Sequence, residues 1–426
     1  MKNSISILIN FFKTSELTDR LLKTVFYLLL FRIGTYIVLP GVDEMAVNNS
    51  GGGLLGLLDS FVGGAFNRKS IFSLGIMPYI SASIILHMMT LLFPNFHRIQ
   101  ADGESGRRKI HQYTKYLTLV IAVIQSVAFF SSNVSQGELL IDKKVFLTIS
   151  TFILIGGSMF CVWLGEKITD KGIGQGTSLL ILVGIISSFP SAVYSEYILK
   201  QGDFVILFLE YSILLLVTAF IVALSLAVRK IKLLYVREMM EYDELNKKRQ
   251  YLPLKLISAG VMPIIFGNVM LMFFAFLCNL LSDKSEIALN IYSSLKDPLS
   301  FGYNITFSIL IVIFTYLYTS ININPVKIAN DLNSNSCFIP GVKPGKATSK
   351  YIDNVLDLIT FPGSIGLAFI AFLPVLANYF EVGGQLAHFY GGTSMLISVP
   401  LAIECWKQIK SYWLLYKYDH LDMFDE

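Results

Sequence analysis

The sequence predicts an all-α polytopic membrane protein, with ten transmembrane helices arranged as two inverted five-helix halves. Its composition, ten apolar segments of spanning length and two pairs of repeated motifs predict this fold. Of the 426 residues, 54% are hydrophobic and 15% are charged, and the mean hydropathy is +0.61. Soluble domains contain about 25% charged residues. A chain this poor in charge cannot cover a globular surface with polar groups.

Ten segments are long and apolar enough to cross a bilayer, which requires about 20 predominantly apolar residues per helix. They lie at about residues 21–40, 71–93, 112–131, 146–165, 178–194, 203–228, 256–281, 303–322, 355–378 and 389–412. The first five spans form a predicted N-terminal half, residues 1–194, and the last five a C-terminal half, residues 195–426. An even number of spans places both termini on the same side.

The distribution of positive charge indicates which side that is. Cytoplasmic loops of membrane proteins carry an excess of Lys and Arg. The odd-numbered loops of this chain hold only Arg68, Lys69, Lys143, Lys144, Lys200, Lys284 and Lys296. The chain has 34 Lys and Arg residues. Nearly all of the others lie in the N-terminal segment, in the even-numbered loops or in the C-terminal tail. Both termini are therefore predicted to be cytoplasmic.

Two pairs of similar hexamers relate the halves. Gly75–Ile80 (GIMPYI) opens the second span and Gly260–Ile265 (GVMPII) opens the seventh. Gly176–Ile181 (GTSLLI) opens the fifth, and Gly392–Ile397 (GTSMLI) lies in the tenth. Each pair joins spans that are five apart, an odd number, so the second half must be inverted. Inverted repeats place functional sites at the interface between halves. Coincidence is the alternative for either pair alone.

Motifs for catalysis, cofactors and metals are missing from the sequence. Gly341–Ser349 resembles a phosphate-binding loop, but only three residues separate Gly341 from Gly345 where that motif needs four, and Ala347 follows Lys346. The four cysteines are far apart in sequence and predict neither a disulfide nor a metal site: Cys161, Cys278, Cys337 and Cys405. We expect no enzymatic activity and no cofactor.

Few ionisable residues lie inside the predicted spans. Glu210, Glu404 and Arg32 do so, and internal pairing within the helix bundle is the simpler interpretation of each. A coupled transporter usually carries acidic groups near the bilayer midplane, so their scarcity argues modestly against ion-coupled transport.

A short apolar segment, Leu54–Asn67, precedes the second span on the predicted external side. It is interrupted by Asp59, Gly63 and Gly64, and it is too short to cross the membrane with its flanks. Such re-entrant segments are tolerated only where protein or a water-filled cavity surrounds them. An ordinary surface helix is the alternative.

Six motifs, in order along the chain, together resemble the SecY family, the central subunit of the bacterial general secretion translocon. They are Ser70–Ile84, Gly103–Lys109, Leu164–Gly176, Leu252–Lys255 followed by Ala259–Pro263, Phe338–Gly345, and Tyr390–Ser394. The resemblance runs from about residue 20 to 412. It implies an hourglass channel that translocates unfolded preproteins and releases hydrophobic segments laterally into the lipid bilayer.

The resemblance places a ring of isoleucines at the waist of this channel. The six positions are Ile80, Ile84, Ile181, Ile185, Ile265 and Ile397. A narrow apolar collar excludes ions by dewetting and gives a passing chain no fixed partner. Without the family, ordinary core packing would be the preferred interpretation of these residues.

The resemblance also assigns a plug and a lateral gate. The segment at about 54–67 matches the family's plug, which moves aside on opening, with Leu54, Leu55, Leu57, Leu58, Phe61 and Val62 as its apolar residues. The seam between the second and third spans and the seventh and eighth matches the lateral gate. Ser81, Ser83 and Asn268 would be polar residues near it, with core polar contacts between helices as the alternative.

The driving force must come from partners, because the chain has no nucleotide site. Its basic loops, about 229–255 and 323–350, resemble docking loops for a SecA-like ATPase and the ribosome, with Arg229, Lys230 and Lys343 as the expected contacts. Many family members have arginine at position 343, and lysine lacks its planar fork. The resemblance further implies SecE-like and SecG-like small membrane subunits, signal sequences as ligands, and a place in the cell (inner) membrane.

Three alternatives to a general translocation channel stay open at this point. Divergence of the 229–255 loop and the lysine at 343 leave room for an accessory family member with a restricted client set. A secondary transporter shares the inverted-repeat design. An insertase or scaffold without its own pore would also use this helix arrangement.

Overall fold

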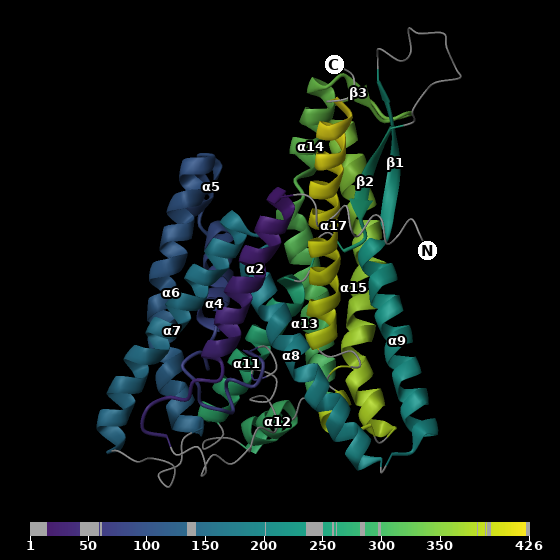
Figure 1. Cartoon of the computed structure of the whole chain (residues 1–426). Helices are drawn as coiled ribbons and strands as arrows, with labels where there is room; N and C mark the ends of the chain where they lie inside the picture. The colour runs from purple at the N-terminus through teal and green to yellow at the C-terminus, as the bar shows by residue number, and fades with distance from the viewer. Residues whose placement is uncertain are drawn as a thin grey trace. The chain divides into compact units, whose positions relative to one another are not determined.

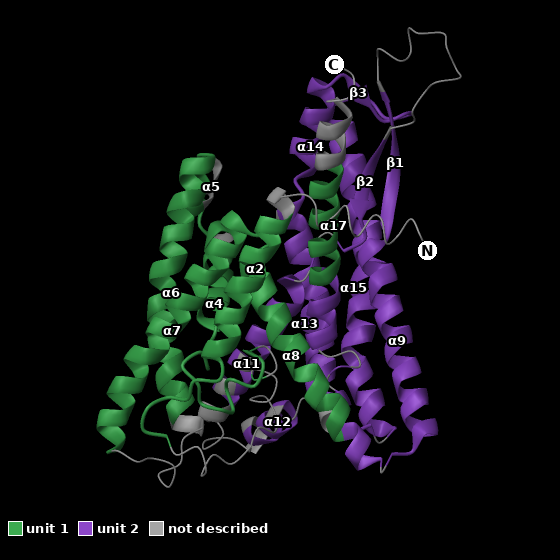
Figure 2. Ribbon diagram, in the orientation of Figure 1, with its two compact units in different colours: residues 1–195, 401–426 green, residues 196–400 purple. Residues whose placement is uncertain are grey.

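The chain is mostly helical (Figure 1). The computed structural model describes residues 15–42, 59, 62–133, 142–200, 202–235, 250–257, 260, 262–281, 286–296, 300–380, 382–387, 389 and 393–422. These residues form two compact units, one of residues 1–195 and 401–426 and one of residues 196–400 (Figure 2). The division into halves at residue 194 stays a prediction, since residues 401–426 group with the first unit.

Helices make up the first unit. They are α2 (Ser15–Gly34), α4 (Met77–Leu92), α5 (Pro94–Ala101), α6 (Glu104–Asn133), α7 (Lys143–Lys171) and most of α8 (Gly176–Leu199). The C-terminal part of α17 (Thr393–Asp422) joins them. Pro78 stands in the first turn of α4, where its missing N–H costs nothing because that group has no intrahelical acceptor.

The second unit combines helices with a small sheet. Its helices are α9 (Phe204–Leu226), α11 (Met262–Leu281), α12 (Glu286–Lys296), α13 (Phe301–Asn322), α14 (Pro325–Ser334), α15 (Lys346–Tyr379), α16 (Gly384–Ala387) and the start of α17. Its strands are β1 (Val228–Tyr235), β2 (Gln250–Lys255) and β3 (Cys337–Phe338).

A helix overlaps each of the ten predicted spans. In chain order they are α2, α4, α6, α7, α8, α9, α11, α13, α15 and α17. Within the described residues, six helical stretches are by themselves long and apolar enough to cross a membrane. Phe204, Val205 and Phe208 on α9 are 77–82% exposed, as expected of side chains that face lipid. The prediction of an all-α polytopic membrane protein is confirmed.

The sheet is the element that the sequence analysis treated as loop. β1 pairs antiparallel with β2, Arg229 opposite Leu254 and Lys230 opposite Pro253, and its other edge pairs with β3. Below it, α14 and α15 complete an apolar core. That core consists of Ile231, Leu254, Leu332, Cys337, Ile339, Ile352, Leu356 and Ile359. The described parts of the 229–255 and 323–350 regions therefore form one packed subdomain of the second unit.

In the first unit, the C-terminal end of the 54–67 segment and the chain that leads from it to α4 are fixed from two sides. Their backbone pairs with the chain that follows α2, through Leu39 N–H to the Lys69 carbonyl and Ile71 N–H to the Ile37 carbonyl, both at 2.9 Å. An apolar core of this unit also holds them, because Phe66 packs edge-on against Phe129 of α6 with ring centroids 4.7 Å apart.

Candidate functional site

The ring isoleucines of the first unit lie on two helices. Ile80 and Ile84 are half-buried on α4, and Ile181 and Ile185 are buried on α8. Each pair is four residues apart, so its members share one face of their helix. The two pairs thus form one apolar row on α4 and a second on α8, as the ring assignment requires.

The other two ring isoleucines lie in the second unit. Ile265 is half-buried on α11, and Ile397 is buried at the start of α17. The last residue of each repeated hexamer lies in the first two turns of a helix. Ile80 and Ile265 each follow by three residues the first residue of their helix, Met77 and Met262. The ring joins residues from both units and stays a prediction.

The polar residues assigned to the lateral gate bond to neighbours within their own units. On α4, Ser81 accepts a hydrogen bond from Gln125 Nε2 of α6 at 3.5 Å. On α11, buried Asn268 accepts from the Tyr303 hydroxyl of α13 at 3.3 Å. Ser83 is half-buried. These contacts hold α4 to α6 and α11 to α13, and sequence reasoning missed both partner residues.

Of the six residues assigned to the plug, only Val62 lies within the described residues, and it is buried. The apolar residues that fall outside the described residues are Leu54, Leu55, Leu57, Leu58 and Phe61. The C-terminal end of the segment is described. There Asp59 Oδ1 accepts from Asn67 N–H at 3.0 Å, and Asp59 Oδ2 accepts from Asn67 Nδ2 at 2.8 Å. Burial raises the pKa of the Asp59 carboxyl, and the hydrogen bonds from Asn67 oppose that rise.

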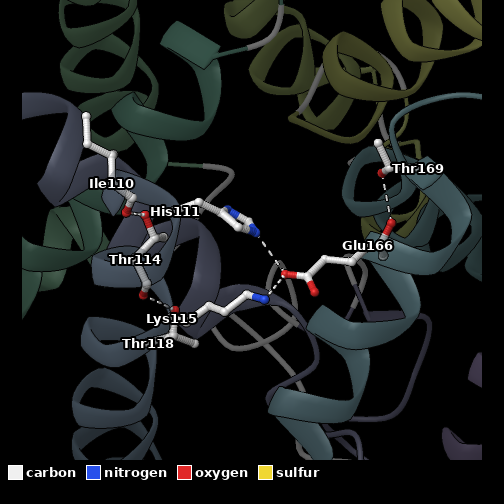
Figure 3. A network of polar contacts seen from close by, with 8 residues as sticks. Ile110, His111, Thr114, Lys115, Thr118, Glu166 and Thr169 are labelled. Atoms are coloured by element: carbon white, nitrogen blue, oxygen red, sulfur yellow. Dashed lines mark hydrogen bonds and ion pairs between the residues drawn. The ribbon is translucent and has the colours of Figure 1, made fainter. Parts of the chain in front are cut away.

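A polar network ties α6, α7 and α8 together at the opposite end of the first unit, and Figure 3 shows its contacts between α6 and α7. Glu166 Oε1 of α7 lies 2.9 Å from His111 Nε2 and 2.6 Å from Lys115 Nζ, both on α6. Thr169 Oγ1 accepts the Gly176 N–H at 2.9 Å, which joins the end of α7 to the start of α8. We name these five residues the Glu166 network. Three of its members, Glu166, Thr169 and Gly176, lie in the Leu164–Gly176 motif that carried part of the resemblance.

The three residues expected to dock partners are exposed in the sheet subdomain. Arg229 and Lys230 are neighbours on β1 and point to opposite faces of the sheet. Lys343 stands in the turn before α15, between Gly341 and Gly345. Both glycines have positive φ, +81° and +93°, a conformation that side chains with Cβ rarely adopt. The structure thus presents all three cations on one folded subdomain.

The two acidic residues identified in the predicted spans differ in burial. Glu210 Oε1 lies 3.8 Å from Lys200 Nζ, and both side chains are largely buried. Glu404 is exposed on α17. Among the described residues, no group of three or more His, Cys, Asp and Glu side chains could hold a metal ion.

These features define a class: a polytopic helical membrane protein whose helix starts repeat between its two halves. Residues 70–406 match the SecY family. The chain is 38% identical over 422 residues to protein translocase subunit SecY of Staphylococcus aureus (strain NCTC 8325 / PS 47), covering 96% of this chain and 97% of that protein. It is 36% identical over 420 residues to the same subunit of Streptomyces scabiei, covering 94% and 95%.

The chain belongs to the SecY family and is a protein translocase subunit. Solved structures with the same fold include one described as a protein conducting channel, with a TM-score of 0.65, 16% identity, and coverage of 93% of this chain and 92% of that one. Another, with a TM-score of 0.63, 16% identity and the same coverage, is described as a SecY channel whose plug domain stabilises the closed state. The relatives are channel-forming translocase subunits.

Proposed function

We propose that the chain is a passive pore of the cell (inner) membrane, with both termini in the cytoplasm, that translocates unfolded preproteins and lets hydrophobic segments leave sideways into lipid. The observation that carries this proposal is the repeated helix start. Four helices, α4, α8, α11 and α17, each place an isoleucine in their first two turns, at the end of a repeated hexamer. An apolar collar built from both halves would close such a pore at rest.

Lateral release follows from the physics of the bilayer. A charged residue at a helix centre costs about 2.5 to 3.5 kcal/mol, whereas large apolar residues are favoured. A seam that exposes the passing chain to lipid therefore sorts segments without further chemistry. The intra-unit bonds Ser81–Gln125 and Asn268–Tyr303 support this proposal, because they keep each gate helix attached to its own neighbour when the seam parts.

A SecA-like ATPase or the ribosome would supply the driving force. A neighbour of the same fold, with a TM-score of 0.59 and 15% identity, is described as Sec61 in a canine ribosome–channel complex. The exposed Arg229, Lys230 and Lys343 suit docking to acidic surfaces. SecE-like and SecG-like subunits would complete the complex. We expect Lys343→Glu to reduce motor-driven export more than co-translational insertion, and equal losses of both would contradict a motor-specific role.

The ring is tested by polar substitution. We expect Ile265→Asn and Ile397→Asn to admit precursors with defective signal sequences and to raise the ion conductance of the resting channel. Ile309→Asn is the matched control, because Ile309 is an isoleucine of spanning helix α13 that is 55% exposed. Unchanged stringency and conductance in both ring variants would overturn the ring assignment.

A crosslinking experiment distinguishes a channel with its own pore from a scaffold without one. Cysteines at Ile84 and Ile185 should crosslink to a stalled secretory chain, since both lie on the proposed pore face of their helices. A cysteine at exposed Phe152 on α7 is the control, because it is 72% exposed and belongs to no proposed pore row. An active complex that gave no crosslinks at positions 84 and 185 would favour an insertase without its own pore.

A further inference from the structure

Arg32 falls within the first predicted span and lies in the last turn of α2, where it contacts the chain that follows the helix. A guanidinium inside a membrane span is costly unless it is paired. Arg32 Nη1 donates to the Gly63 carbonyl at 3.2 Å, and Nη2 donates to the Tyr36 hydroxyl at 3.3 Å. The guanidinium also lies 5.3 Å from the centroid of the Tyr36 ring. Of the two hydrogen bonds, the one to Gly63 joins residues farther apart in sequence, and it ties Arg32 to the backbone of the 54–67 segment.

Gly63 fits a socket that admits no side chain. Its φ is +68°, and a Cβ built there would lie 2.3 Å from Ser187 Oγ of α8 and 2.5 Å from Arg32 Nη1. Its neighbour Gly64 also has a positive φ, +87°, but a Cβ there would meet only Arg68, no closer than 3.4 Å. Both glycines adopt a backbone conformation that would strain a residue with a Cβ, and only Gly63 is enclosed by α8 and Arg32.

The segment on either side of Gly63 is closed into a loop. Asp59 binds both the backbone and the side-chain nitrogens of Asn67, and the Gly64 N–H donates to the Asp59 carbonyl at 3.0 Å. Because these bonds tie Asp59 to the residues after Gly63, a contact that holds Gly63 also holds Asp59. We name residues Arg32, Asp59, Gly63 and Asn67 the plug anchor.

We propose that Arg32 is a positioning residue that seats the C-terminal end of the plug in the closed channel, by holding the Gly63 carbonyl in its socket against α8. The inference rests on the proposed function, because it assumes that the 54–67 segment is a plug. A single hydrogen bond from a charged donor is strong enough to bias an equilibrium, and weak enough in net terms to break when the channel opens. Opening then requires the Arg32–Gly63 bond to separate.

The test compares variants of the full chain, assembled with its partner subunits in liposomes, by the ion conductance per resting channel. Arg32→Met keeps the length of the side chain and removes the donors, and Gly63→Ala fills the socket. We expect each to raise resting conductance about tenfold, the shift that follows from losing one charge-assisted bond. The matched controls are Gly64→Ala and Arg68→Met, since Arg68 stacks on Tyr36 at 4.3 Å without contacting Gly63 in any described bond. These should change conductance less than twofold.

Rescue distinguishes positioning from a role in folding alone. Arg32→Lys retains one donor that can reach the Gly63 carbonyl but lacks the fork that also binds Tyr36, so we expect conductance between the wild-type and Arg32→Met values. All variants are compared at equal amounts of assembled complex. If Arg68→Met leaks as much as Arg32→Met and Arg32→Lys gives no rescue, the leak does not depend on the Gly63 contact, and the proposal is overturned.

Deletion of residues 54–61 separates this inference from the plug assignment. A leak in the deletion with none in Arg32→Met leaves the plug standing and overturns the anchor. No leak in the deletion overturns the plug assignment and the anchor with it. If both leak, the double variant decides: no further leak than the deletion alone supports the anchor, because both changes act on one element, and additive leaks show that Arg32 acts elsewhere.

Discussion

The two ends of the first unit are held by different chemistry. At the end with the plug anchor, one guanidinium holds a backbone carbonyl, and the fit depends on a glycine with no side chain. At the end with the Glu166 network, a carboxylate receives two donors from α6, and a threonine hydroxyl joins α7 to α8. The first arrangement breaks with one bond, whereas the second requires several bonds to break together. The comparison suggests a fixed frame at one end and a releasable contact at the other.

This contrast predicts that steric change near the anchor outweighs electrostatic change in the network. Gly156 and Gly157 are neighbours on α7. A Cβ at Gly157 would lie 2.4 Å from the Ile71 carbonyl, in the chain that follows the plug, whereas a Cβ at Gly156 would meet nothing within 4 Å. We expect Gly157→Ala to destabilise the assembled protein by about 2–3 kcal/mol, as overpacking does, measured as thermal unfolding in detergent.

Gly156→Ala provides the matched control for that measurement. It should be neutral or stabilising by up to about 1 kcal/mol, the difference in helix propensity between alanine and glycine. Equal destabilisation by both substitutions would mean that α7 does not back onto Ile71, and the packing described for this end would be wrong.

Sequence reasoning found the parts of the fold that depend on local pattern. Apolar segments of spanning length predicted where the helices lie, because lipid demands about 20 apolar residues in a row. Three of the repeated hexamers predicted where a helix begins, and the fourth, placed within the tenth predicted span, overlaps the start of α17. The alternation in Val228–Tyr235 is a strand signal, but it was masked by its position among charged residues and was interpreted as loop. The sheet of the second unit was therefore not predicted.

Sequence reasoning could not find contacts between residues distant in the chain. Arg32 and Gly63 are 31 positions apart, and nothing in either local sequence indicates that they meet. The same holds for Asn268 and Tyr303, and for His111 and Glu166. Gly63 was identified only as an interruption of an apolar segment, because the need for a missing side chain is set by Ser187 on another helix. The family resemblance supplied positions for the ring and plug but no partner residues.

The Glu166 network should affect stability more than closure. Glu166→Gln removes the charge that binds His111 and Lys115, whose side chains are 43% and 35% exposed. Since the pairs are partly exposed, we expect a loss of about 1 kcal/mol in the free energy of unfolding, with no change in resting ion conductance. Glu104→Gln is the control, because its partner Arg108 is largely exposed. A leak as large as that of Arg32→Met would end the distinction between frame and releasable contact.

The smallest effect is expected at Thr169, where one hydroxyl carries the junction between α7 and α8. Thr169→Val keeps the shape of the side chain but removes the acceptor of the buried Gly176 N–H. An unsatisfied N–H costs more than the net value of its bond, but Thr169 itself is exposed and water can replace part of the interaction. We therefore expect a loss below about 1 kcal/mol in thermal unfolding, and Thr169→Ser, which retains the hydroxyl, should match wild type. If Thr169→Val instead opened the resting channel while Thr169→Ser did not, the α7–α8 junction would be part of the gate, and the fixed frame would have to be confined to the bonds between α6 and α7.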